Sequence, residues 1–211
     1  MKKILFILFA VCLSLPLYAG GGKDSAASSG SSLKTAPDAA AYLGGRNIRG
    51  LTGSTDPAGG LSLSADLFAQ FVNKKYGSNI FIDPLGAEEA LREIASARPD
   101  GGTIMMISDA VFFDVLSGAH DAADYRLEDF LVGGAYALSA SESADKEYFL
   151  FYPKEMSADF IAAMDIAITD ICNSQAYKDA LTSLGFAARA KGSAEAASAI
   201  SAKRDALSSL P

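Results

Sequence analysis

The residues best placed to bind a ligand lie in a loop of small side chains at positions 53–62, whose sequence is GSTDPAGGLS. A short apolar run at 48–52 precedes the loop, and a helical pattern to Tyr76 follows it with Ser62 as the expected N-cap. Backbone N–H groups at the start of a helix lack helical partners, and here they could converge on a carboxylate or phosphate. The alternative is a tight turn in which the glycines only bend the backbone.

The rest of the sequence offers little for catalysis or metal binding. His120 is the single histidine, and no second histidine or thiolate lies near it in the sequence, which argues against a metal site. Cys172 lies in an apolar helical stretch and is expected to be a small core residue. Neighbouring acids such as Glu88 and Glu89 are expected to be solvated charges. We therefore predict no enzymatic activity, no metal and no cofactor.

The elements around the loop predict an α/β fold with a mostly parallel central sheet flanked by helices. The first three apolar runs alternate with helical patterns, and this order favours parallel strands joined by right-handed crossovers. Gly133 and Gly134 indicate a bend in a later strand. The predicted strands are 48–52, 79–82, 103–107, 130–138 and 147–152, and helices are expected at about 157–172, 175–184 and 194–209.

The N-terminal residues predict export of the protein. Residues 1–19 combine two lysines, an apolar run at 4–15 and a possible cleavage site, which is typical of a signal peptide. Retention of this segment as a membrane anchor is the alternative, and Cys12 raises the option of lipidation. Residues 20–44 are rich in Gly, Ser and Ala and predict a flexible tether. A single domain is then expected at 45–211.

The net charge and the cysteine content limit the kinds of partner that the protein is expected to have. The net charge is −7, and removal of residues 1–19 with their two lysines makes it −9. This acidity argues against nucleic acid or an anionic membrane surface as the main partner. Cleavage would also leave Cys172 as the single cysteine, so the fold needs no disulfide partner.

Five short segments occur in an order that is found in one known family. They are PAGG at 57–60, KYG at 75–77, ASARPDG at 95–101, Tyr125 followed by LEDF at 127–130, and YKDAL at 177–181 with LGF at 184–186. In this series the chain resembles the periplasmic substrate-binding proteins of tripartite tricarboxylate transporters. The resemblance covers roughly residues 46–140 and 147–209.

The resemblance implies a binding site for a small carboxylate. In the family the carboxylate is held largely by loop backbone in a crevice between two α/β lobes. Carried over to this sequence, the first-lobe site comprises Ser54, Thr55, Ala58, Gly59, Gly60 and Ser62, with Ser108 and Asp109 from the loop after the third strand. The resemblance also implies a periplasmic location and membrane components of a tripartite transporter as partners.

Three departures from the family pattern favour a second hypothesis. The segment that would build most of the second lobe is absent after residue 140, and the glycine-rich loop after the second strand is shortened to 83–86. Asp66 lies near the position where the family has an arginine on its first helix. The alternative function is therefore a reduced, one-lobe homologue that no longer captures solute and acts through protein–protein interaction.

Overall fold

The computed structural model describes residues 38–119, 125–140 and 146–208. These residues belong to one compact unit. The predicted signal peptide, most of the predicted tether and His120 lie outside the described residues. In the described part, no helix has both the length and the apolar character needed to cross a membrane.

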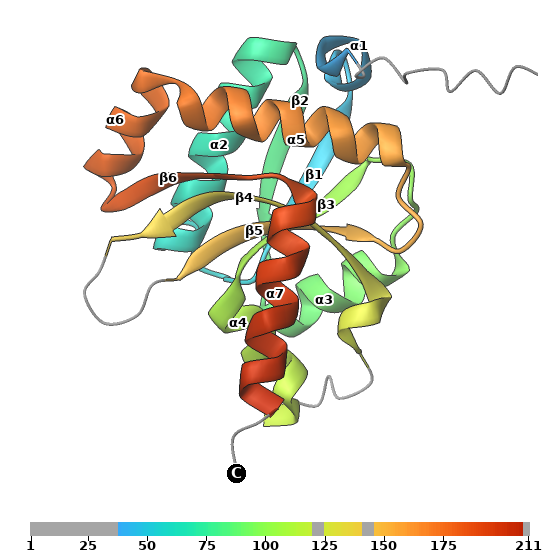
Figure 1. The fold of residues 1–211 in the computed structure, drawn as a ribbon. Coiled ribbons are helices and arrows are strands. Elements are labelled where there is room, and N and C mark those ends of the chain that lie inside the picture. Colours follow the sequence, from blue (N-terminus) through green and yellow to red (C-terminus); the bar gives the residue numbers. More distant parts are fainter. Residues whose placement is uncertain (1–37, 120–124, 141–145, 209–211) are drawn as a thin grey trace, which may run out of the picture. The chain divides into compact units, whose positions relative to one another are not determined.

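A six-stranded mixed sheet forms the centre of the domain, in the order β2-β1-β3-β5-β4-β6 (Figure 1). β1 pairs in parallel with both β2 and β3, whereas β5 is antiparallel to β3, and β4 is antiparallel to β5 and β6. The strands are β1 (Asn47–Thr52), β2 (Asn79–Pro84), β3 (Thr103–Ser108), β4 (Phe130–Ser139), β5 (Glu147–Pro153) and β6 (Phe186–Lys191). The α/β class and the parallel pairing of the first three strands are confirmed.

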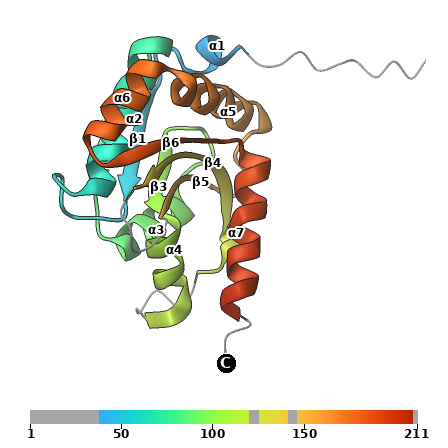
Figure 2. The same cartoon turned by 60° about the vertical axis from the view of Figure 1, so that its left-hand side comes forward.

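Helices cover both faces of the sheet (Figures 1 and 2). The four central strands, β1, β3, β5 and β4, contribute side chains to two separate apolar clusters, one on each face. One cluster joins the sheet to α1 (Ala39–Leu43), α2 (Gly60–Tyr76), α5 (Ala158–Asn173) and α6 (Gln175–Ser183). The other joins it to α3 (Ala87–Ser96), α4 (Asp109–Asp114) and α7 (Ser193–Ser208). A π-helical turn, η1 (Val115–Ala119), and a 3-10 turn, η2 (Leu127–Asp129), complete the second face.

Three features differ from the sequence-based expectations. The sheet is mixed rather than mostly parallel, since β5, β4 and β6 pair only antiparallel. β6 was not predicted at all. The folded domain starts before residue 45, because α1 lies in the predicted tether and buries Leu43 completely against the core. Ala39 and Leu43 of α1 are buried, and the Tyr42 hydroxyl donates a hydrogen bond to Asp159 of α5 (3.0 Å), so this end of the predicted tether is part of the fold.

The chain passes from β4 to β5 through only seven residues, 140–146. A hydrogen bond from the Ser139 N–H to the Lys146 carbonyl (2.9 Å) closes the two strands at the base of this link. β4 runs in the same direction as β1 and β3, so the link lies at the edge where those strands end. We call this the carboxyl edge. The described residues form one α/β lobe.

Candidate functional site

The loops that follow β1, β2 and β3 meet at the carboxyl edge, which is where ligands bind in open α/β sheets. A Cβ added to Gly53, after β1, would lie 3.4 Å from the Val111 side chain in α4. A Cβ added to Gly86, after β2, would lie 3.9 Å from the Thr55 methyl group. The β1–α2 loop therefore lies close to α4, which follows β3, and to the β2–α3 loop. The ligand-binding role of the residues assigned from the sequence stays a prediction.

Several polar groups of the β1–α2 loop bond to one another. The Asp56 carboxylate accepts a hydrogen bond from the Ala58 N–H (2.9 Å), and the Asp56 carbonyl accepts one from the Gly59 N–H (3.2 Å). The Asp56 N–H in turn donates to the Ser54 hydroxyl (3.2 Å). Three backbone N–H groups of the loop are thus satisfied internally, as the tight-turn interpretation requires. They are not directed at a ligand.

The first turn of α2 is the part of the loop that remains open to a ligand. Gly59 is the N-cap, and no side chain from the described residues caps the helix. Ser62 is not the cap that we expected: it is 2% exposed and donates its hydroxyl hydrogen to the Asp56 carbonyl (2.8 Å). Thr55, Ala58 and Gly60 are exposed. A carboxylate at this edge would therefore meet first-turn N–H groups and small side chains.

Ser108 and Asp109 are buried and hold α4 in place. The Ser108 hydroxyl accepts a hydrogen bond from the Val111 N–H (3.3 Å) and so caps α4. The Asp109 carboxylate accepts one from the Ala110 N–H (2.6 Å) and forms an ion pair with Lys203 of α7 (2.6 Å). Both side chains are already engaged, so a ligand would have to displace Lys203 to reach Asp109.

Phe186 and Tyr148 form an aromatic pair beside Gly60 of the candidate site. The sequence did not predict this pair. A Cβ added to Gly60 would lie 2.9 Å from the Phe186 ring, which packs edge-to-face on the Tyr148 ring at 5.4 Å. Burial raises the pKa of Tyr148, and the nearby negative charge of Asp109 raises it further. Phe186 is the first residue of β6. The sequence shows no clear strand pattern there, so its position beside Gly60 was not predicted.

An open cavity of about 690 Å³ lies between α3 and α4, next to the β2–α3 loop. Its charged lining comprises Glu88, Glu89 and Asp114 against Arg92. This excess of carboxylates disfavours an anionic ligand, even though the cavity begins at Gly86, beside Thr55. A small carboxylate is better accommodated at the start of α2 than in this cavity.

The described residues contain no group of three or more His, Cys, Asp or Glu side chains that could hold a metal ion. Cys172 is buried, and its thiol points to the Tyr136 carbonyl at 3.3 Å. Burial raises the pKa of Cys172 to about 12. The thiol is therefore neutral at physiological pH and is a poor nucleophile.

Comparison with known proteins finds solved structures with a similar fold but no family model or curated protein with a matching sequence. MatC from Rhodopseudomonas palustris, solved with bound malate, gives a TM-score of 0.63 at 11% identity and covers 76% of this chain and 97% of that one. A second R. palustris protein, with adipate, gives 0.60 at 8% identity, covering 77% and 95%. A TctC solute-binding protein from Polaromonas, without ligand, gives 0.59 at 10% identity, covering 78% and 99%.

Proposed function

We propose that the protein is an exported, one-lobe solute receptor that binds a small carboxylate at the carboxyl edge. The observation that carries this proposal is the shared fold with periplasmic binding proteins, two of which were solved with malate or adipate. The close approach of the β1–α2 loop to the β2–α3 loop and to α4 at this edge also supports it. Membrane components of a tripartite transporter are the partners that this function requires. The predicted signal segment at 1–19 is consistent with it.

Binding by the single lobe should be weak. The start of α2 contributes roughly 0.3–1 kcal/mol to holding an anion. Asp56 and Asp66 oppose it, each by about 1 kcal/mol or less, because both are exposed. Three loop N–H groups are also already bonded. We therefore expect dissociation constants of about 1 mM or higher, equivalent to some 4 kcal/mol.

The test is a titration of the mature protein with succinate, malate and citrate, followed by calorimetry and by amide NMR shifts. We expect shifts at Thr55 and Gly60. Ala58→Glu adds a negative charge to the exposed loop and should weaken binding about fivefold, or about 1 kcal/mol.

The matched control is Ala41→Glu, at an exposed position of α1, which precedes the opposite end of β1. It should leave the affinity unchanged. Micromolar affinity for the isolated monomer would show that one lobe suffices for tight binding. Equal effects of the two variants would place the ligand elsewhere.

A second function, docking of another protein at the carboxyl edge, is favoured by two exposed leucines. Leu63 is 37% exposed in the first turns of α2, beside the β1–α2 loop. Leu184 is 39% exposed and precedes Gly185, whose carbonyl accepts a hydrogen bond from Ala140 at the β4–β5 link (3.1 Å). Apolar side chains exposed on this edge are consistent with a partner that covers it.

A further inference from the structure

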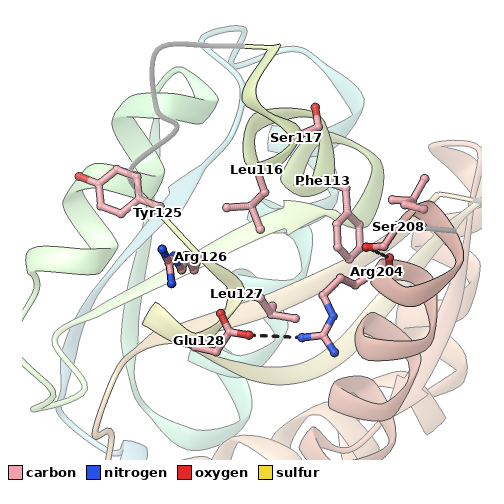
Figure 3. A pocket seen from close by; sticks show the side chains of 10 residues that line it. Phe113, Leu116, Ser117, Tyr125, Arg126, Leu127, Glu128, Arg204 and Ser208 are labelled. Carbon is pink, nitrogen blue, oxygen red and sulfur yellow. Dashed lines mark hydrogen bonds and ion pairs between the residues drawn. The ribbon is translucent and has the colours of Figure 1, made fainter. Parts of the chain in front are cut away.

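A separate cavity of about 380 Å³ lies between α4, η2 and the end of α7 (Figure 3). We call it the α7 cavity. Phe113 and Leu116 line one side, and Leu127 and Leu207 line the others. We propose that the α7 cavity binds a small monocarboxylic acid with an apolar body, such as a phenylalkanoic or short-chain alkanoic acid. This site differs from the carboxyl-edge site and does not depend on it.

The apolar lining provides the first argument. The four side chains come from four different elements, α4, η1, η2 and α7, and face a common space, as Figure 3 shows for Phe113, Leu116 and Leu127. Leu207 remains 45% exposed, which makes it one of the few large apolar side chains open to solvent in the described chain. Pockets for small ligands are typically lined in this way, and 380 Å³ lies at the small end of their range.

The charges at the rim provide the second argument. Arg204 is engaged, since it pairs with Glu128 (3.3 Å) and with Asp205 (3.1 Å). Arg126 lines the same cavity and is exposed, and no hydrogen bond or ion pair joins its guanidinium to any residue that the structure describes. A cation with no partner among the described residues, beside an apolar surface, favours an amphiphilic anion.

The charges of Arg126, Arg204 and Glu128 also determine how many carboxylates a ligand of the α7 cavity can carry. A single carboxylate can pair with Arg126 while the apolar body lies against Leu116 and Leu127. A second carboxylate would need Arg204, which is already paired, and would lie close to the negative charge of Glu128. The α7 cavity should therefore prefer monocarboxylates, whereas the proposed site at the carboxyl edge is tested with di- and tricarboxylates.

The test uses 3-phenylpropanoate and hexanoate as probes, with neutral 3-phenylpropanamide and succinate as comparisons. Calorimetry and amide NMR should detect both monocarboxylates with shifts at Tyr125, Arg126 and Leu127. Arg126→Gln should weaken 3-phenylpropanoate about tenfold, because a hydrogen bond to a charged group is lost. The control Arg98→Gln, at another exposed arginine, should not change the affinity. Binding should also weaken as salt is added.

A second pair of variants tests the apolar wall. Leu207→Ser should weaken 3-phenylpropanoate about threefold to tenfold, whereas Leu184→Ser, a similarly exposed leucine outside the cavity, should have no effect. Ala58→Glu should leave monocarboxylate binding intact, which separates this site from the carboxyl edge. The proposal is overturned if the wild-type protein shows no shifts at these residues with tens of millimolar probe. It is also overturned if the amide binds as well as the acid, or if Arg126→Gln binds like the wild type.

Discussion

At the scale of single residues, Gly134 is the most tightly enclosed glycine in the strands of the described sheet. A Cβ added there would overlap both the Ile168 side chain of α5 and the Lys191 carbonyl of β6. The carbonyl belongs to a backbone that is paired with β4, so it cannot move freely. The register of β4 also shifts between Val132 and Ala137. The bent or bulged strand predicted from the glycine pair is thus confirmed, and the missing side chain at Gly134 leaves room for the close approach of α5 and β6.

Gly134→Ala should therefore lower the free energy of unfolding by about 1–3 kcal/mol, the usual cost of overpacking a rigid site. Gly86→Ala is the control, because the nearest atom to its added Cβ is 3.9 Å away. Urea unfolding of the two variants measures both effects. If Gly134→Ala unfolds at the same urea concentration as the wild type, the contact between β4 and β6 is looser than described.

The candidate site residues show what residue types alone cannot reveal. The spacing of Ser54, Ser62 and Ser108 correctly indicated loops that lie at one edge of the sheet. It could not indicate that all three hydroxyl groups bond within the fold. Ser and Asp cap turns and bind ligands with the same atoms, so only the geometry separates the two roles. Lys203, almost a hundred positions from Asp109, was not predictable as its partner.

At the scale of elements, a carboxylate of α5 caps the first turn of α7. The Ser193 N–H and hydroxyl both donate to the Asp165 carboxylate of α5, at 2.9 and 2.6 Å. The sequence predicted a helix at 194–209, but the carboxylate that caps it lies on another element and was not predictable. β6 was missed for a similar reason, since its pairing with β4 and the ion pair of Lys191 with Glu147 (2.7 Å) are both tertiary.

Two carboxylates of α5 should give opposite pH effects on stability. Burial raises the pKa of Asp165, despite the hydrogen bonds from Ser193 that lower it. Its stabilising contribution is therefore complete below the unfolded value, near 4, and is lost as pH rises through the folded pKa. Hydrogen bonds from Lys75 and Tyr76 lower the pKa of Asp170, so its contribution is present above pH 4 and is lost as pH falls.

Urea unfolding between pH 3 and pH 7 measures these effects. Relative to the wild type, Asp165→Asn should gain stability as pH rises above 4. Asp170→Asn should lose stability as pH rises toward 4 and stay lower above it. Parallel pH profiles for the two variants would contradict the opposite shifts of the two carboxylates.

At the scale of the whole molecule, the fold is a single α/β lobe whose two halves differ in predictability. The strand–helix alternation up to β3 predicted parallel pairing, because crossover helices leave few other solutions. The pairing of β5 between β3 and β4 depends on long-range contacts and could not be read from the local pattern. The short link at 140–146 leaves the carboxyl edge without a facing lobe within the described residues. Weak solute binding and partner docking therefore remain the two functions to separate.

Photo-crosslinking in the native host separates them. A photoreactive residue at Leu184, on the carboxyl edge, should capture a partner protein if docking is the function. The matched control is Phe81, which is 48% exposed on β2 at the far end of the sheet order and should capture nothing. Leu63→Asp, on the same edge as Leu184, should reduce capture because it places a charge against the apolar contact. Equal capture at Leu184 and Phe81, or none at either, would contradict docking at this edge and leave carboxylate binding as the supported function.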